Sequence, residues 1–349
     1  MTRYDLTIHG AGIFGLSIAW EAVRRGARVR VIETHAIGAG SSGGVVGALA
    51  PHVPENWNPK KQFQLESLLM AEAFFGSASD ASGLPTGYAR TGRLQPLADA
   101  AAMALAHQRS ATAVTLWQDH AVWQVIPVPP GEWVPASPSG FVVHDTLTAR
   151  TNPRQTLAAL AAAIGHHGQI ILGDGPAPSD GDGPTIWATG TAGLDALTTS
   201  TGHGMGGGVK GQAALLRFAA SDLPQLFVDT LHIVPHANGT VAIGSTSEHD
   251  WTDPTATDGQ LDALLTRART ALPVLRDAPV IDRWAALRPR AKSRAPILGA
   301  WPGRPGHYVA NGGFKIGFGM APKVAACMVD LVLEGRDTIP PGFAFDAKG

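Results

Sequence analysis

Near the start of the chain, apolar positions follow the pattern of a strand, a helix and a second strand. Residues 5–10 alternate Leu6 and Ile8 with polar residues and end at a glycine, as strands commonly do. Residues 16–26 place apolar side chains at helical spacing and close on a glycine. Residues 27–33 return to alternation, so the pattern predicts a βαβ unit.

Further along, the pattern predicts a return to this first domain. Asn152 precedes residues 153–165, which begin with proline and read as a helix with an asparagine cap. Strands are expected over residues 169–173 and 185–190, with a Gly/Asp/Pro loop at 174–184 between them. These elements suit a nucleotide-binding domain.

Other segments predict a second domain built on strands. Residues 231–248 hold Asn-Gly between two β-rich runs, the strongest short signal for a hairpin. Together with residues 209–218 and 282–290 they predict a mainly antiparallel sheet. An amphipathic helix is expected over residues 62–75, whereas the Pro- and Trp-rich segment 120–140 is interpreted as irregular connections.

A glycine motif joins the first predicted strand to the first predicted helix. It consists of Gly10, Gly12, Ile13, Phe14 and Gly15, a G-x-G-x-x-G match. Such glycines allow a tight turn, close approach of the backbone to a pyrophosphate, and close helix–strand packing. Glu33, at the end of the second strand, can accept both ribose hydroxyls. The pattern therefore predicts an adenine dinucleotide without a 2′-phosphate, which leaves NAD and FAD open and disfavours NADP.

A second glycine–serine segment follows five residues after Glu33. Ser41, Ser42 and Gly43 can offer hydroxyl and backbone N–H groups to phosphate oxygens, although a flexible surface loop would have the same composition. FAD needs such an additional loop more than NAD does. Thr189 and Gly190, at the end of a predicted strand, are expected close to the same cofactor.

Composition adds few constraints. The chain has 349 residues, 44% of them hydrophobic, and a formal net charge of −1, so it shows no basic footprint for nucleic acid or anionic membrane. One cysteine, Cys327, excludes an internal disulfide and fits a reducing compartment. Without a long apolar run, no membrane insertion is expected, and we predict a cytoplasmic protein. The thirteen histidines are scattered and suggest no metal site.

Six segments, in this order, resemble the FAD-dependent D-amino acid oxidase superfamily, especially bacterial glycine oxidase and monomeric sarcosine oxidase. They are GAGIFG with Glu33, GAGSSGGVVGALAP, VKGQ, HIVPHANGTVAIGSTSEHDW, RWAALRPRAKSRAPILG and NGGFKIGFGMAP. The resemblance covers nearly the whole chain. It implies FAD, a discontinuous Rossmann-like cofactor domain, and a substrate domain whose antiparallel sheet roofs the flavin.

Pattern and resemblance together predict an α/β plus α+β fold with two domains. The FAD-binding domain is expected to comprise residues 1–80, 141–200 and 285–349, and the substrate-binding domain 81–140 and 201–284.

The resemblance also implies a role for the glycine-rich segment near the C-terminus. In this family the segment passes under the flavin, where glycine permits close approach. It contributes Gly312, Gly313, Phe314, Lys315, Ile316 and Gly317. The last helix is expected to start at Met320-Ala321-Pro322, with its N-terminus toward the pyrimidine end of the flavin.

Three residues are implied in catalysis. By resemblance, Arg288 and Lys315 hold the substrate carboxylate over the flavin, so that the α C–H faces flavin N5 for hydride transfer. Without the resemblance, Lys315 would read as a surface lysine and Arg288 as part of a structural ion pair. His232 stands where glycine oxidase has a tyrosine. It is interpreted either as a donor or pH-sensitive group, or as a wall residue.

Two departures from the family bear on its redox chemistry. Ala242 stands where sarcosine oxidase has an oxygen-activating lysine, so either O₂ or another electron acceptor is compatible with the sequence. The cysteine that tethers the flavin in sarcosine oxidase has no counterpart, so non-covalent FAD is expected, and Cys327 is interpreted as packing.

The leading hypothesis is oxidation of the C–N bond of a small amino acid or secondary amine, with the imine then hydrolysed. Glycine, sarcosine, a D-amino acid or an imino acid would all fit. Two alternatives are flavin-dependent trimming of carboxymethylaminomethyl-uridine in tRNA, and a flavoprotein redox partner without amine turnover. The sequence does not name the amine, its chirality, the electron acceptor or the oligomeric state.

Overall fold

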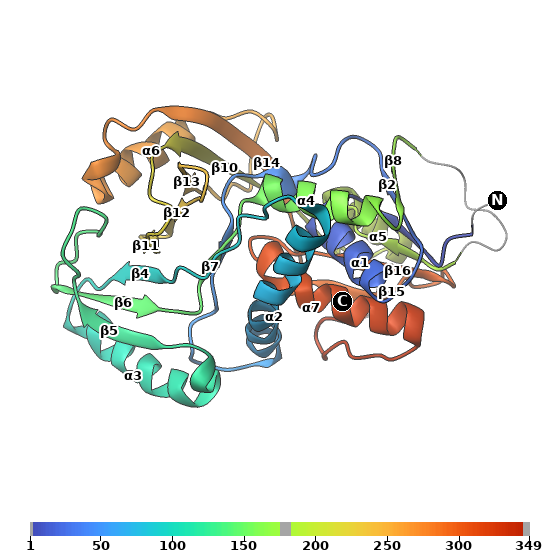
Figure 1. The fold of residues 1–349 in the computed structure, drawn as a ribbon, viewed down its shortest axis with the longest axis horizontal. Helices are drawn as coiled ribbons and strands as arrows, with labels where there is room; N and C mark the ends of the chain where they lie inside the picture. Colours follow the sequence, from blue (N-terminus) through green and yellow to red (C-terminus); the bar gives the residue numbers. More distant parts are fainter. Residues whose placement is uncertain (1–2, 175–182, 345–349) are drawn as a thin grey trace.

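The computed structural model describes residues 3–174 and 183–344, and two sheets form its framework (Figure 1). A six-stranded sheet lies on the right of Figure 1 and an eight-stranded sheet on the left. A two-stranded ladder of β3 (Ala48–Leu49) and β7 (Ala149–Arg150) accompanies them. In the described part of the chain, the predicted mixed α/β and α+β class is confirmed.

The six-stranded sheet is mainly parallel. Each neighbouring pair is parallel except β15 with β16, which is antiparallel. In spatial order the strands are β15 (Ile297–Ala300), β16 (His307–Asn311), β9 (Thr185–Trp187), β1 (Leu6–His9), β2 (Val29–Glu33) and β8 (Gln169–Leu172). Three stretches of chain that are distant in sequence thus build one sheet, and the second of them, which holds β8 and β9, is the one whose apolar pattern predicted a return to the first domain.

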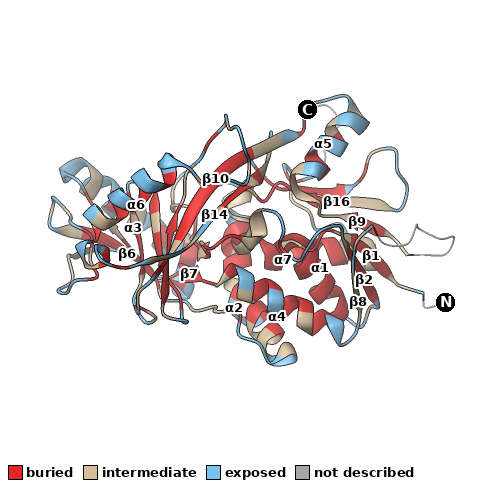
Figure 2. Ribbon diagram, turned by 90° about the horizontal axis from the view of Figure 1, so that it is seen from above, coloured by how far each residue is buried: buried red, intermediate tan, exposed pale blue. Residues whose placement is uncertain are grey.

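Helices cover both faces of this sheet. Four of them pack on one another beside it, and a fifth shares an apolar cluster with β9, β15 and β16. The four are α1 (Ile13–Arg24), α2 (Pro59–Ser82), α4 (Pro153–Gly165) and α7 (Gly317–Glu334), and the fifth is α5 (Gly190–Thr201). Buried apolar residues of α1 and α7 belong to the largest core cluster, and both helices are largely buried in Figure 2.

The eight-stranded sheet is antiparallel except for one parallel pair, β11 with β4. Its spatial order is β14 (Val280–Ala291), β10 (Gly206–Arg217), β13 (Thr240–Gly244), β12 (Leu231–Pro235), β11 (Gln225–Val228), β4 (Arg93–Pro96), β6 (Phe141–Asp145) and β5 (Trp123–Pro127). Helix α6 (Gly259–Ala271) packs on β10, β12 and β13, and α3 (Ala100–Trp117) packs on β5. The 3₁₀ turns are η1 (Ser41–Gly43), η2 (Gln118–His120) and η3 (Pro273–Leu275).

Most predicted elements form where the apolar pattern placed them. The Asn-Gly hairpin joins β12 to β13, and the two long segments of the second domain pair as β10 and β14. Asn152 caps α4, because its side chain accepts a hydrogen bond from the Gln155 backbone N–H. Cys327 is a buried packing residue, as predicted, and Trp123 and Trp133 are also buried.

Two predictions about secondary structure were wrong. The last helix begins at Gly317, so Pro322 lies inside α7 rather than at its start. The segment 120–140, interpreted as irregular connections, contains β5, whose apolar side chains pack under α3. The predicted loop at residues 174–184 falls mostly outside the described residues.

We propose to keep the predicted two-domain division with two changed boundaries. Strand β6 was assigned to the cofactor domain, yet it pairs with β4 and β5 of the eight-stranded sheet. The boundary at residue 285 falls within β14, which pairs with β10 as far as Ala291. Moving both strands to the substrate domain keeps each sheet intact.

Candidate active site

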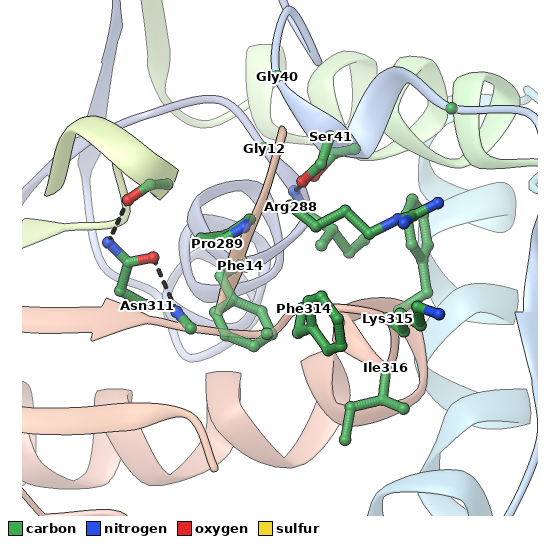
Figure 3. Close-up of a pocket in the computed structure, with 18 of the residues that line it drawn as sticks. Gly12, Phe14, Gly40, Ser41, Arg288, Pro289, Asn311, Phe314, Lys315 and Ile316 are labelled. Atoms are coloured by element: carbon green, nitrogen blue, oxygen red, sulfur yellow. Dashed lines mark hydrogen bonds between the residues drawn. The ribbon is translucent and has the colours of Figure 1, made fainter. Parts of the chain in front are cut away.

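A cavity of about 1130 Å³ lies between the two sheets and is lined by residues of both. On one side it meets the carboxyl ends of β1, β2 and β9, the edge at which open α/β sheets bind ligands. On the other side it meets His232 of β12 and Arg288 of β14. Part of the lining is drawn in Figure 3.

Three helices begin at the cavity. The first residues of α1, α5 and α7 are Ile13, Gly190 and Gly317, and all three line it. These described helices have neither a side-chain cap nor an acidic residue in the first turn. Ser42 Oγ already accepts from the Ile13 N–H at the start of α1. The partial positive charge of the three helix N-termini still faces the cavity, an arrangement that suits an anionic ligand such as a pyrophosphate.

The glycine motif is shaped by close contacts within the protein. Gly10 has φ of +103°, and a Cβ there would lie 2.4 Å from the carbonyl oxygen of Ala188. A Cβ on Gly12 would lie 3.1 Å from Ser42 Oγ, which accepts a 3.0 Å hydrogen bond from the Ile13 backbone N–H. The second predicted loop thus docks on the first, so both glycine segments form one wall of the cavity.

Glu33 sits at the end of β2 with both carboxylate oxygens engaged by the backbone. Oε2 accepts from Ala11 N–H at 2.9 Å, and Oε1 accepts from His35 N–H at 3.0 Å. These bonds hold the carboxylate at the cavity rim. Each oxygen keeps a second acceptor direction, which is the capacity that binding a ribose requires.

The C-terminal glycine segment is fastened to its surroundings at both ends. Asn311 Nδ2 donates to the carbonyl oxygen of Gly190 at 2.8 Å, and Asn311 Oδ1 accepts from Gly312 N–H at 2.7 Å (Figure 3). A Cβ on Gly313 would lie 2.9 Å from the ring of Phe14. Protein packing alone therefore requires glycine here, in addition to the predicted closeness to flavin.

Fifteen of the predicted cofactor residues line the cavity. They are Gly10, Gly12, Ile13, Phe14, Glu33, Ser41, Ser42, Thr189, Gly190, Gly312, Gly313, Phe314, Lys315, Ile316 and Gly317. Gly15 and Gly43 are not in the lining. A Cβ on Gly15 would meet the Gly10 carbonyl oxygen at 1.8 Å, and the Gly43 carbonyl accepts from Arg154 Nε at 2.9 Å, so both support the loops from behind. The cradle fits FAD, and the role of each residue in binding it stays a prediction.

Arg288 projects from β14 into the cavity with its guanidinium almost fully buried. Its Nη1 donates to the Thr246 carbonyl oxygen at 3.1 Å. The group lies directly over Gly211 of β10, where a Cβ would fall within 1.9 Å of both terminal nitrogens. Burial lowers the pKa of Arg288 to about 10, while the nearby Glu248 carboxylate acts in the opposite direction.

Lys315 is brought to Arg288 by backbone contacts. Phe314 N–H donates to the Pro289 carbonyl oxygen at 3.0 Å, and Arg290 forms a β-bridge with Gly313. The two predicted catalytic cations therefore reach the same side of the cavity (Figure 3). Burial lowers the pKa of Lys315, and the positive charges of Arg288 and Arg290 lower it further.

His232 lines the cavity in neutral form. Burial lowers its pKa to about 3, helped by the positive charges of Arg93 and Lys315. Its Nδ1 is buried and has no hydrogen-bond partner among the described residues. A pKa near 3 removes the predicted titration close to neutral pH, and His232 remains either a neutral donor or a wall residue.

Sequence reasoning missed several lining residues. Arg93, Trp187, Trp284 and Arg304 were not singled out, although all four line the cavity. Arg304 lies over the ring of Trp187 at 5.6 Å. Arg93 begins the short strand Arg-Leu-Gln-Pro, whose sequence contains no motif that could have marked it.

Two further features are absent from the described residues. Across residues 3–174 and 183–344, no group of three or more His, Cys, Asp or Glu side chains could hold a metal ion. Within the same ranges, no helix is long and apolar enough to cross a membrane.

Comparisons with known proteins agree with this geometry. The family described as FAD dependent oxidoreductase matches residues 5–331. The glycine oxidase of Pseudomonas aeruginosa is 35% identical over 132 residues, a match that spans 38% of this chain and 36% of that relative. The glycine oxidase of Geobacillus kaustophilus is 25% identical over 367 residues, covering 96% of this chain and 94% of that protein.

The fold is shared with a solved structure. The crystal structure of glycine oxidase from Geobacillus kaustophilus superposes with a TM-score of 0.84 at 20% identity, covering 99% of each chain. The chain belongs to the FAD dependent oxidoreductase family, and it is an FAD-dependent oxidase or dehydrogenase of amines or amino acids.

Proposed function

We propose that this protein oxidises the C–N bond of a small amino acid or secondary amine that carries a carboxylate. The observation that carries the proposal is the pairing of Arg288 and Lys315 at one side of the cavity. Arg288 is buried and Lys315 lines the same cavity, while Glu33 is the one acid in the described lining. Two cations at one side of a cavity favour an anionic ligand, because the buried guanidinium loses hydration that a partner of opposite charge replaces.

The two cations divide the work of holding the substrate. Arg288 offers a planar fork for a carboxylate, and its contacts with the Thr246 carbonyl and with Gly211 keep the fork in place. Lys315 adds a second positive charge from the segment that precedes α7. Fixing the carboxylate at two points orients the α carbon, and this positioning is the main contribution we assign to these residues.

The cavity also determines which protonation state the substrate needs. Glu33 is the one Asp or Glu in its described lining, and its carboxylate binds the Ala11 and His35 backbone. With His232 neutral, the substrate end supplies no ionised base. The amine therefore loses its proton before the reaction, and the two cations favour this neutral form by disfavouring an ammonium.

The predicted cofactor supplies the redox chemistry. When bound in this cradle, FAD accepts the hydride equivalent released from the substrate α carbon. We expect non-covalent binding, because no cysteine lies in the described cavity lining. Ala242 is buried beside Val45, Ala213 and Val234. An alanine at that position supplies no charge, so the residue does not favour O₂ over another electron acceptor.

Both alternatives have less support. The relatives are glycine oxidases, which favours a free amino acid over a uridine in tRNA. A redox partner without amine turnover would not need Arg288 and Lys315 at the cavity. Which amine and which chirality are accepted is left to experiment.

An anaerobic titration of the purified flavoprotein tests the function. Glycine, sarcosine, proline and both enantiomers of alanine are added in turn while the oxidised flavin band is recorded. We expect at least one to bleach the band, and acetate, which has a carboxylate but no amine, to bind without bleaching it. If no amine bleaches the flavin, the proposal of amino-acid oxidation is refuted. Admitting air after bleaching then tests O₂ as acceptor.

A further inference from the structure

A second guanidinium faces the same cavity from another strand. Arg93 of β4 lines the cavity although its side chain is only 6% exposed. Its Nε donates to Asp145 Oδ2 at 2.9 Å. Among the described residues this is its one hydrogen bond, so the terminal Nη groups have no protein acceptor.

Asp145 does not account for the whole guanidinium. It belongs to β6 and faces Arg93 across the β4–β6 ladder. Its other oxygen accepts from Thr148 N–H at 2.8 Å, which stabilises the turn after β6. The structural role of the pair thus uses Nε alone. A guanidinium is suited to bidentate recognition through its remaining N–H groups.

Arg93 belongs to a wall distinct from the one that carries Arg288. Its guanidinium lies over the Phe227 ring at 5.5 Å, and that ring lies 4.6 Å from the ring of His232. The three residues come from the neighbouring strands β4, β11 and β12. Arg288 comes from β14, at the far edge of the same sheet, and Lys315 from the segment before α7.

The charge of the cavity is unbalanced between these walls. Arg93, Arg288 and Lys315 all line it, and the one acid in the described lining, Glu33, is occupied at the end of β2. The charges of Arg93 and Lys315 both act on His232, so neutral His232 separates two cationic regions. A ligand with one carboxylate would satisfy one of them.

We propose that Arg93 forms a second anion subsite and that the preferred substrate carries a second acidic group beyond the carboxylate held by Arg288 and Lys315. The substrate class is a dicarboxylic amino acid or a secondary amine with two carboxylate arms. The inference rests on the proposed function for the site of oxidation, and its binding test does not depend on turnover.

The first test uses ligands that cannot react. The dissociation constants of α,ω-dicarboxylates from malonate to adipate are measured by perturbation of the flavin absorbance. Each is compared with the monocarboxylate of equal carbon number, for example glutarate with pentanoate. We expect at least one dicarboxylate to bind about tenfold tighter than its partner, as one charge-assisted hydrogen-bond pair predicts. Equal affinities along the whole series would overturn the proposal.

The second test removes the subsite. Arg93→Gln with Asp145→Asn removes both charges together, because Arg93→Gln alone would leave a buried carboxylate unpaired. The control is Arg109→Gln with Glu55→Gln, an ion pair of 2.6 Å that does not line the cavity. We expect the dicarboxylate advantage to disappear in the first double variant, with pentanoate affinity unchanged, and to persist in the control. An advantage kept by both variants refutes the assignment to Arg93.

A matched pair of amines completes the test. Iminodiacetate and N-ethylglycine have the same backbone and differ in one terminal carboxylate. We expect iminodiacetate to have the higher kcat/KM, through a lower KM, and to lose that advantage in the Arg93/Asp145 variant. If neither amine nor any simple amino acid reduces the flavin, the proposed function fails, while the glutarate comparison still decides the subsite. If the variant does not fold, the wild-type affinities decide.

Discussion

At the scale of single residues, Gly211 determines where Arg288 can lie. The guanidinium occupies the place that a side chain at Gly211 would take, since a Cβ there would come within 1.9 Å of it. The same group donates to the Thr246 carbonyl. Thr246 in turn accepts from the Gln212 N–H through Oγ1 and donates its own N–H to the Gln212 carbonyl. The carboxylate-binding fork is therefore held by its neighbours before any ligand arrives.

We predict that Gly211→Ala displaces Arg288 and weakens carboxylate binding. Losing one charge-assisted interaction should raise the dissociation constant of acetate about tenfold to a hundredfold, with FAD content unchanged. Flavin absorbance titration measures both quantities. Gly207→Ala, in the same strand with open space around it, is the control and should bind acetate normally. Normal acetate affinity in Gly211→Ala would contradict the proposed role of Arg288.

Lys315 should make carboxylate binding depend on pH. Its pKa is lowered by burial first and by Arg288 and Arg290 next, so it is protonated at low pH and loses its charge earlier than a surface lysine as pH rises. Above the pH range in which acetate itself is protonated, its affinity should therefore stay constant and then fall as pH rises through the lowered pKa of Lys315. Lys315→Met should bind acetate weakly and show no such fall below about pH 10, where Arg288 itself titrates.

The matching control is Lys292→Met, an exposed lysine nearby, which should keep the wild-type pH profile. Acetate carries no amine and is fully ionised in the alkaline range, so a fall in affinity there reports the protein and not the ligand. If the fall survives unchanged in Lys315→Met, another group is responsible.

From the sequence alone, a residue could be predicted to line the cavity only if it belonged to a recognised motif. Arg288 and Lys315 lay in segments that resemble a family, and both line the cavity. Arg93 lay in a short strand without a motif, and only the pairing of β4 with β11 and β6 turns it toward the cavity. The low pKa of His232 depends on burial and on two distant charges, which sequence spacing does not reveal.

At the scale of helices and strands, element boundaries were predicted correctly where the sequence has a strong capping or turn signal. Asn152 followed by proline specified the start of α4, and Asn-Gly specified the β12–β13 hairpin. The helix α3 was missed because it buries few residues and packs mainly on β5, so its apolar pattern is weak. Pro322 suggested a helix start that tertiary packing overrode, since α7 begins five residues earlier.

We predict that Asn152→Ala destabilises the protein through α4. The side chain accepts from Gln155 N–H, and its loss should cost about 1 kcal/mol, which corresponds to a decrease of about 1 to 2 °C in Tm for a chain of this length. Thermal unfolding of the apoprotein followed by circular dichroism measures it. Asn152→Asp keeps an acceptor and should stay close to wild type. Equal losses in the two variants would show that the cap is not the cause.

At the scale of the whole molecule, the cavity exists only where the two sheets meet. The six-stranded sheet supplies the helix N-termini and Glu33, and the eight-stranded sheet supplies Arg288, His232 and Arg93. A ligand long enough to touch both sides therefore stabilises their arrangement as well as its own site.

Adding FAD to the apoprotein should raise Tm in a concentration-dependent way. A ligand that binds only the folded state contributes about 2.7 kcal/mol at one hundred times its dissociation constant. NAD and NADP, tested at the same concentrations, should produce little or no shift if the cradle selects FAD. Differential scanning calorimetry provides the comparison. A larger shift with NAD than with FAD would be incompatible with the assigned cofactor.

The strand order of the six-stranded sheet has a consequence for synthesis. β1, the first strand to be synthesised, pairs with β9, and β9 pairs with β16. The ribosome reaches β16 about three hundred residues after β1. The cofactor domain therefore cannot close its sheet while the ribosome is still making the middle of the chain. Until then the glycine loops of the βαβ unit lack their contacts with the later strands. We therefore expect FAD to bind only after most of the polypeptide has been synthesised.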